Sequence, residues 1–515
     1  MTKNIKVSIS ELCYYMFFCI LFLAKGIGLY DGQTVFKICL VIAAGFVLVK
    51  IFMTGYPAAE MAVIAALLVL GVVIYKNSGE KSALIFLTMM IAFKNISFDR
   101  IMKVSLWIWG AAFGGMVLFS MLGMESDIVM AHHKFGIDIL RRGMGYSHPN
   151  VLHVSYAILV VLILFAVSKG ENKIKAYIWV FAGNVLVFLY SASYTGFMLV
   201  IFLILFNIYF SYRKSFSVAE KVLIQSIFPI CVLFSLFAPL MVKPDTFLFR
   251  ILNKALNQRF YASRLYMQEN PLTLFGSRIY ASHAYALDNS YVTLLIYGGL
   301  ILFVLVCGGY IYTIHMCMKK QDGKALSVLL SFAIAGVIEP FLFNLSFKNL
   351  SLLLVAASIF AISKGKKEIP LLSGRDREII IKRSAFLQRL KRPADLAAVR
   401  KSMVIAVIIG VLAGGCYYVA VKMPSTIYVH EKYCDISGEV MAIDPLAYEG
   451  NVDVVIYGCK EEPGNVYQFG SQTVRFEKFR DAVRLTFVVI LAGYAGLPYL
   501  FAGKKGNVVE DKLYD

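Results

Sequence analysis

Charged residues are scarce in this chain. They make up 16% of its 515 residues, and 59% of the residues are hydrophobic, whereas a soluble domain is about 25% charged and about 45 to 50% apolar. The mean hydropathy is +0.71. The shortage of charge excludes a soluble globular protein and predicts an all-α polytopic membrane protein.

Three further absences narrow the class. No small-residue cleavage site follows the first apolar stretch, 13–23, so we expect a first helix there rather than a signal peptide. No arginine-rich tract or nucleic-acid motif accompanies the net charge of +19, so we expect no nucleic-acid partner and interpret the charge as the Lys/Arg excess that orients spans. No inverted repeat is apparent, which disfavours an alternating-access carrier.

Apolar stretches recur along the chain, and we expect about fourteen to cross the membrane. Lys/Arg clusters alternate with them and predict that both termini are cytoplasmic. The predicted spans are 12–29, 34–53, 59–75, 82–93, 101–122, 151–168, 175–191, 195–211, 221–241, 291–313, 325–343, 349–363, 403–421 and 483–502.

Composition divides the chain into three parts. Residues 1–363 form the dense helical bundle, with outer loops at 123–149 and 242–290. Residues 364–402 form a basic cytoplasmic linker, suited to anionic headgroups. Residues 403–515 are predicted to be a two-helix anchor around a small extracytoplasmic β or α+β module, 423–480.

Within that module, β-like runs at 426–430, 452–457 and 473–476 are separated by Gly and Pro signals. The nine cysteines lie mostly in predicted spans, but Cys434 and Cys459 share this polar segment, and they could form a disulfide only if it faces outward. We expect the module to carry no catalytic group.

Two outer loops carry positive charge on the side where it is normally sparse. The loop 242–290 contains six Lys/Arg against three Asp/Glu, and the loop 123–149 ends in Arg141 and Arg142. A guanidinium can bind phosphate oxygens bidentately and keeps its charge. We therefore expect anionic headgroups at this surface, with salt bridges or lipid contacts as the alternative role of each arginine.

Smaller polar features fall on the same side. Residues 191–196, including Ser193, form a small polar break between two spans, as expected for backbone that lines a cavity or for a tight turn. Asp288 and Asn289 precede the next span, where an N-cap is the ordinary alternative. Glu339 is an acid within a predicted span and so a functional candidate.

These features resemble the Wzy-type bacterial polysaccharide polymerases of the O-antigen polymerase and ligase group. The resemblance covers roughly the first 363 residues. The chain departs from it at Tyr194, where the family often has Arg. The resemblance rests on Gly145, Tyr146, Ser147, His148, Pro149 and Asn150, on residues 191–196, on Asn257, Gln258 and Arg259 followed by Phe275 and Gly276, and on Asp288, Asn289, Ser290 and Tyr291 with Gly298.

The resemblance implies a multi-pass glycosyltransferase of the bacterial plasma membrane. Its substrate would be a polyprenyl-pyrophosphate-linked glycan, and a flippase and a chain-length regulator would be its partners. The module 423–480 would then influence glycan length or partner contact, with an accessory anchor that has no effect on the product as the alternative. Deletion after Lys401 would leave glycan synthesis intact and shift the length distribution. Asp288, where related ligases carry His, is the leading base, with His148 as runner-up. The expected substrate-binding residues are Arg259 and Arg142 for pyrophosphate, Arg264 and Arg141 as helpers, and Asn289, Ser193 and Glu339.

Other readings stay open. An O-antigen-type ligase would use the same chemistry on another acceptor, and a polysaccharide or lipid-linked sugar exporter would use cationic sites without catalysis. A sensor or structural membrane protein would give the outer arginines no evident purpose. Glu125 and Asp127 suggest a metal-dependent version, but we expect no metal and no cofactor, and the adjacent His132 and His133 are poorly placed to bind one ion together.

Overall fold

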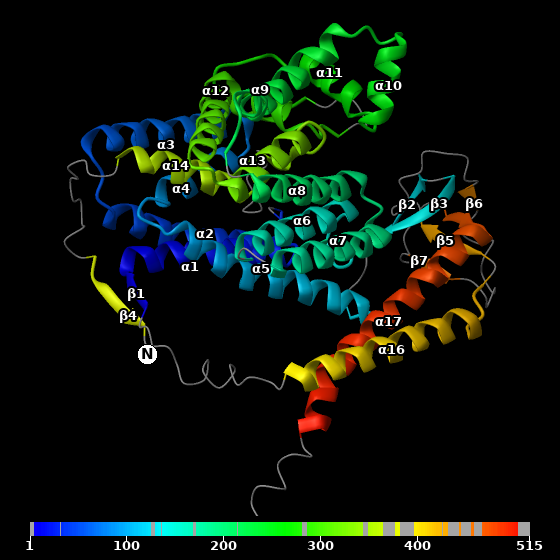
Figure 1. Cartoon of the computed structure of the whole chain (residues 1–515). Helices are drawn as coiled ribbons and strands as arrows, with labels where there is room; N and C mark the ends of the chain where they lie inside the picture. Colours follow the sequence, from blue (N-terminus) through cyan, green and yellow to red (C-terminus); the bar gives the residue numbers. More distant parts are fainter. Residues whose placement is uncertain are drawn as a thin grey trace, which may run out of the picture.

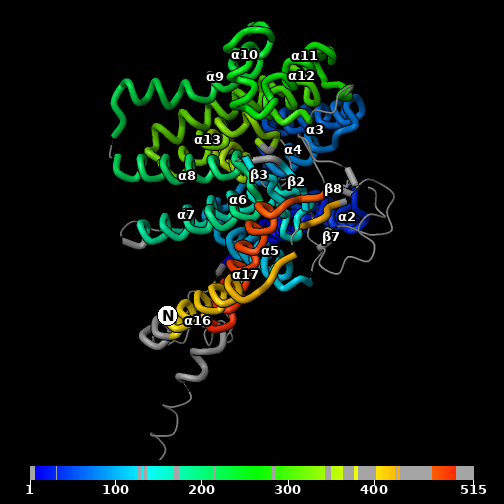
Figure 2. Tube along the Cα trace, turned by 90° about the vertical axis from the view of Figure 1, so that its right-hand side faces the viewer, coloured from blue at the N-terminus to red at the C-terminus, as the bar shows by residue number. Residues whose placement is uncertain are grey.

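The protein is a predominantly helical, multi-pass membrane protein (Figures 1 and 2). The computed structural model describes residues 5–30, 32–124, 129–134, 136–167, 171–213, 215–280, 286–342, 349–363, 376–381, 396–424, 426–430, 442–443, 455–457 and 466–502. Within them, ten helices are long and apolar enough to cross a membrane.

The long helices pack side by side in the upper part of Figure 1. The N-terminal part of the bundle contains α1 (Ile9–Gly26), α2 (Thr34–Met53), α3 (Ala58–Ser78), α4 (Ser82–Ala92) and α5 (Phe98–Met121). The remainder contains α6 (Pro149–Ala166), α7 (Glu171–Ser191), α8 (Tyr194–Tyr212), α9 (Val218–Met241), α12 (Ser290–Lys319), α13 (Gly323–Ala335), α14 (Ser351–Phe360) and the short turns η1 (Pro340–Leu342) and η2 (Ala361–Ser363).

Each of the fourteen predicted spans contains a helix, but four are not among the ten candidate spans. Helices α4, α13 and α14 have 11, 13 and 10 residues, and a helix rises only about 1.5 Å per residue. The fourth is α17 (Ser471–Ala502), whose first turns carry several charges. The number of spans and their orientation therefore stay predictions.

Short elements occupy both of the charged loops, 123–149 and 242–290. The hairpin β2 (Val129–Lys134) and β3 (Ile137–Arg142) occupies the first loop. Helices α10 (Phe247–Ala255) and α11 (Arg259–Glu269) occupy the second. Side-chain hydroxyls of Ser and Thr cap many helices, as Thr246 does for α10 by accepting a hydrogen bond from the Phe249 N–H.

Part of the predicted linker is docked on the bundle. Strand β4 (Glu378–Ile381) pairs antiparallel with β1 (Ile5–Ser8). Beside it, Asp376 accepts hydrogen bonds from the backbone N–H and the hydroxyl of Ser10, at 2.9 and 2.7 Å. Residues 5–10 and residues 376–381 of the basic segment therefore lie side by side.

The C-terminal part is a helical hairpin carrying a small sheet (Figure 2). Helix α16 (Leu396–Ala420) packs along α17, and Gly410 and Gly414 allow close approach, since a Cβ at either would lie under 3 Å from α17 atoms. The sheet has the order β6-β8-β5-β7. Its strands are β5 (Ile427–His430), β6 (Ala442–Ile443), β7 (Val455–Tyr457) and β8 (Val466–Phe469).

The sheet confirms β-structure at the first two β-like runs, but the third prediction was wrong. Residues 473–476 form the first turns of α17, not a strand. Their Thr, Val and Phe favour a strand locally, yet a helix places Glu477 and Arg480 on one buried face. Cys434 and Cys459 lie outside the described residues.

The sheet, the start of α17 and the β2–β3 hairpin share one apolar core. Val129, Ala131 and Leu140 of the hairpin are buried against Ile427, Val429, Phe469 and Val474. The predicted boundary at residue 403 therefore separates chain segments that pack together.

Candidate functional site

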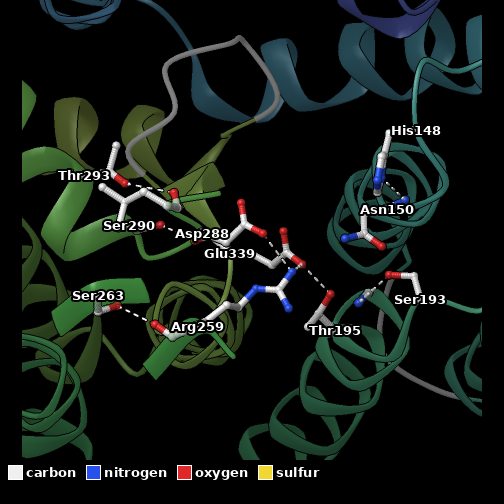
Figure 3. A network of polar contacts seen from close by, with 12 residues as sticks. His148, Asn150, Ser193, Thr195, Arg259, Ser263, Asp288, Ser290, Thr293 and Glu339 are labelled. Carbon is white, nitrogen blue, oxygen red and sulfur yellow. Dashed lines mark hydrogen bonds and ion pairs between the residues drawn. The ribbon is translucent and has the colours of Figure 1, made fainter. Parts of the chain in front are cut away.

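Polar side chains converge where α6, α8 and α12 begin and α7 and α9 end. At their centre lies Arg259, the first residue of α11. Its guanidinium Nη2 is 2.9 Å from Asp288 Oδ2 and 3.4 Å from Glu339 Oε1 (Figure 3). The structure thus brings together three of the predicted site residues from segments 80 positions apart.

The Nε–H of Arg259 is a buried donor that is unpaired within the described residues. Arg259 is 9% exposed, and its Nε–H has no hydrogen-bond partner among the described residues. A buried, unpaired donor carries a desolvation cost of about 1 to 3 kcal/mol. An anion entering the site would relieve that cost.

Asn289 and Ser290, which follow Asp288, hold this site in place through different contacts. Asn289 caps α12, because its Oδ1 accepts from the N–H groups of Tyr291 and Val292, and its Nδ2 donates to the Val337 carbonyl. The Ser290 hydroxyl donates to the carbonyl of Glu339. These contacts clamp the start of α12 to the turn that carries Glu339, so the structure places Asn289 in a supporting position.

The two carboxylates differ in access. The Asp288 side chain is 30% exposed and that of Glu339 only 8%. Burial raises the pKa of Asp288 above its ordinary value, and the neighbouring Arg259 partly offsets that rise. Asp288 is therefore the carboxylate that a substrate could reach.

Thr195, in the first turn of α8, is a member of the site that sequence reasoning did not select. Its hydroxyl donates to Glu339 Oε1 at 2.5 Å (Figure 3). The polar run 191–196 pointed to this region, but the orientation of α8 decides which hydroxyl enters the site. Ser193 instead caps α8, accepting from the Gly196 N–H at 3.5 Å.

Arg141 approaches the cluster from β3. Its Nε donates to the Ser191 carbonyl at 2.8 Å, and its Nη2 donates to Asn150 Oδ1 at 2.6 Å. It is close enough to Glu339 to attract its carboxylate. The site thus has two arginines around two acids.

A network of hydrogen bonds between buried side chains lies on the other side of Ser191. The buried His153 Nε2 lies 2.7 Å from Asn184 Oδ1, and its Nδ1 lies 2.9 Å from the Ser191 hydroxyl. The order Ser-His-Asn resembles a catalytic triad. All three residues are fully buried, however, so the network positions the backbone between α7 and α8 rather than reaching a substrate.

The structure places three other predicted residues in supporting contacts. Arg142 forms an ion pair of 2.6 Å with the buried Glu477 of α17. Arg264 donates to carbonyls at the end of α9, those of Pro239, Leu240 and Val242. His148 caps α6, its Nδ1 accepting from the Asn150 N–H at 3.0 Å. These contacts favour structural roles for Arg142 and Arg264 over the predicted binding of pyrophosphate.

A cavity of about 280 Å³ is lined in part by Leu287 and Pro340, the sequence neighbours of Asp288 and Glu339. It lies between the α3–α4 turn and α12. Its lining is mostly apolar and consists of Ile74, Glu80, Ser82, Ala83, Leu287, Thr293, Leu294, Tyr297, Gly298, Leu302 and Pro340.

No metal-binding group is found among the residues that the structure describes, where a group means three or more His, Cys, Asp or Glu. Glu125 and Asp127, on which the metal-dependent alternative rests, lie outside those residues. Comparisons with protein-family models, with curated proteins and with solved structures find nothing that matches this chain. The functional argument therefore rests on the chemistry of the site.

Proposed function

We propose that this protein is a membrane glycosyltransferase that joins polyprenyl-pyrophosphate-linked oligosaccharide repeat units. The supporting observation is the buried Arg259, which pairs with Asp288 and Glu339 and whose Nε–H has no partner within the described residues. In this proposal the chain has fourteen spans and cytoplasmic termini, and its site faces the outer side of a bacterial plasma membrane. The reaction needs no metal.

The reaction needs a base and a stabilised leaving group. The bond between the donor sugar C1 and the pyrophosphate oxygen breaks, and the acceptor oxygen bonds to C1. The acceptor proton passes to Asp288, and the pyrophosphate leaves with the bonding electron pair. Asp288 then returns the proton to solvent, to which it is partly exposed.

Proton transfer and leaving-group stabilisation are coupled through Arg259. Once Asp288 takes the proton it is neutral, and its attraction for the Arg259 guanidinium falls. That guanidinium is then free to bind the departing pyrophosphate, with its Nε–H as an additional donor. Glu339, held by Thr195, keeps Arg259 in place.

The apolar cavity suits the lipid part of the substrate. It lies directly beside Leu287 and Pro340, the neighbours in sequence of Asp288 and Glu339. Isoprene units next to the pyrophosphate would fill such a lining, since burying apolar surface stabilises the complex.

The test uses purified full-length protein in proteoliposomes with a lipid-linked repeat unit as both donor and acceptor. The expected product is a ladder of longer lipid-linked glycans. Asp288→Asn should lower the rate about 100-fold or more. Asp245→Asn, an exposed acid in the same loop, should leave it unchanged.

Each outcome discriminates between functions. A ladder in the parent and none in Asp288→Asn supports polymerisation. Transfer only to an added acceptor of another kind indicates a ligase, and transport of the unit without a new glycosidic bond indicates an exporter. A full ladder from Asp288→Asn overturns the proposed base.

A further inference from the structure

Helix α10 carries an apolar face that the described part of the chain leaves uncovered. Phe247, Leu248 and Ile251 all point outward, and Phe247 is 74% exposed. In a helix these positions share one side. A patch of this kind on a nine-residue helix marks an interaction surface rather than a buried core.

Positive charge borders the same face. Arg250 and Lys254 are four residues apart, so they form a row along one edge of α10, and both are exposed. Lys243 lies exposed in the preceding turn. An apolar face edged by Lys and Arg is typical of helices that lie in a membrane interface.

The opposite side of α10 is fixed to α11. The Phe249 ring packs edge-on against Phe260, with centroids 5.3 Å apart. Asn253 Oδ1 accepts a hydrogen bond from the Tyr261 N–H at 2.9 Å. The two helices therefore form one unit, and α10 does not need to bury its outer face against the rest of the fold.

The position of α10 indicates what covers that face. Helix α9 ends at Met241, which is 77% exposed, and α10 begins six residues later. In Figure 1, α10 runs across the direction of α6, α7 and α8. A helix that leaves the end of a span and runs across the bundle lies at the level of lipid headgroups.

We infer that α10 is an interfacial anchor that lies on anionic phospholipid at the membrane face where α9 ends. Phe247, Leu248 and Ile251 enter the boundary between headgroups and acyl chains, about 5 to 10 Å deep. Arg250 and Lys254 bind the phosphates. A soluble partner or a second copy would account for the apolar face but not for the cationic edge beside a span.

Anchoring of α10 also affects the candidate site. Only this step of the inference rests on the proposed function. Arg259 begins α11 four residues after α10 ends. The sharp connection contains Asn257 and Gln258, both with positive φ. Anchoring α10 therefore fixes the height of Arg259 relative to the lipid phosphates, where the pyrophosphate of a lipid-linked substrate would lie.

The experiment places a photoreactive benzophenone amino acid at position 247 or 251 of the full-length protein. The protein is held in nanodiscs of either pure phosphatidylcholine or phosphatidylcholine with phosphatidylglycerol, each lipid carrying a detectable tag. The control carries the probe at Gln268, an exposed polar position of α11. Insertion of each variant is checked by size-exclusion chromatography.

We expect lipid adducts at positions 247 and 251, at least about threefold above position 268, and a preference for phosphatidylglycerol. Arg250→Gln combined with Lys254→Gln should abolish that preference, because each cation near an anionic surface contributes measurably. Adducts to protein instead of lipid, lipid adducts no greater than at 268, or no preference in the parent would overturn the inference. The readout needs no glycan synthesis, so it is independent of the proposed enzyme.

Discussion

At the scale of residues, Arg259 combines two ion pairs with an Nε–H that no described residue accepts. Lysine at this position would keep the charge but cannot present several donors in one plane. We expect Arg259→Lys to insert normally and to slow polymerisation about 10- to 100-fold, since hydrogen bonds between charged groups contribute about 1.5 to 3 kcal/mol. The rate of ladder formation in proteoliposomes measures this.

Arg278→Lys is the matched control for that substitution. It lies in the same loop, is exposed, and keeps its charge in the variant. Its rate should equal that of the parent. If Arg259→Lys also matches the parent, the pyrophosphate is bound by other residues.

The acidity of Asp288 gives a second residue-scale prediction. A base must be deprotonated, so the rate should fall as pH falls through the pKa of Asp288. Because burial raises that pKa, the midpoint should lie above the ordinary aspartate value of about 3.9. Removing the charge with Arg259→Gln should raise the midpoint further.

The pH dependence of the initial rate tests this assignment. The remaining activity of Asp288→Asn should show no such acid limb. An acid limb at the same pH in the parent and in Asp288→Asn would show that another group titrates.

The residue scale also shows where sequence reasoning stopped. Composition and charge pattern predicted arginines and acids at one membrane face. The chain uses Arg142, Arg264, Asn289 and Ser193 to hold helices and loops together. Which polar group caps a helix and which faces a cavity depends on helix rotation, and charge pattern alone does not determine rotation.

At the scale of elements, α12 is broken to receive another segment. Gly299 has φ 74° and ψ 170° inside the helix. The N–H groups of Leu300 and Ile301, released by the break, donate to the carbonyls of Thr273 and Leu274, at 2.9 and 3.2 Å. Segment 272–277 therefore satisfies backbone that would otherwise be unpaired at the membrane.

Glycine is required at both contacting points. A Cβ on Gly276 would lie 2.0 Å from the Tyr297 carbonyl oxygen, and one on Gly299 would lie 2.2 Å from the Gly276 nitrogen. Both have positive φ. We expect Gly276→Ala or Gly299→Ala to destabilise the protein by about 3 kcal/mol or more, measured as a lower melting temperature in detergent.

Gly308→Ala in the same helix provides the control. Among the described residues, no atom outside the adjoining backbone of α12 lies within 4 Å of its added Cβ, and alanine favours a helix by about 1 kcal/mol over glycine. Its melting temperature should be unchanged or higher. Equal melting of the parent and Gly276→Ala would show that segment 272–277 does not insert at the break.

At the scale of the whole molecule, α17 ties the C-terminal part to the site. Arg480 is fully buried and pairs with Glu477 at 2.5 Å. It also donates to the carbonyls of Leu140 and Leu189. These carbonyls lie next to Arg141 and near Ser191, so α17 sets the position of β3 against α7.

Deletion after Lys401 should therefore abolish synthesis rather than only alter product length, which replaces the expectation from sequence. Arg480→Gln tests the contact without truncation. It should cost about 3 kcal/mol, because Glu477 and several carbonyls lose a buried cation. Thermal unfolding in detergent measures the cost, and the polymerisation rate should fall with it.

Arg475→Gln is the control, since Arg475 is exposed on the same helix. A surface change of this kind should stay within about 0.5 kcal/mol of the parent. If the truncated chain folds and polymerises like the parent, the C-terminal hairpin is a separate accessory unit after all.

The sequence by itself determined that this protein lies in a lipid bilayer and where its helices lie along the chain. Apolar runs about long enough to cross the hydrocarbon core are expected to span it. A helix lies at each of the fourteen predicted positions. The polar motifs also pointed to one end of the bundle. The bilayer location and the helix positions follow from local composition, so they can be predicted without knowing which residues contact one another.

Only the tertiary structure decided which residues meet. The pairing of Arg259 with Asp288 and Glu339 joins segments far apart in the chain, and Thr195 enters the site through the orientation of α8. The contact of α17 with the first outer loop spans 340 positions. Such contacts depend on how helices pack and rotate. Many side chains from different helices decide that packing together, so it leaves no periodic signal in the sequence.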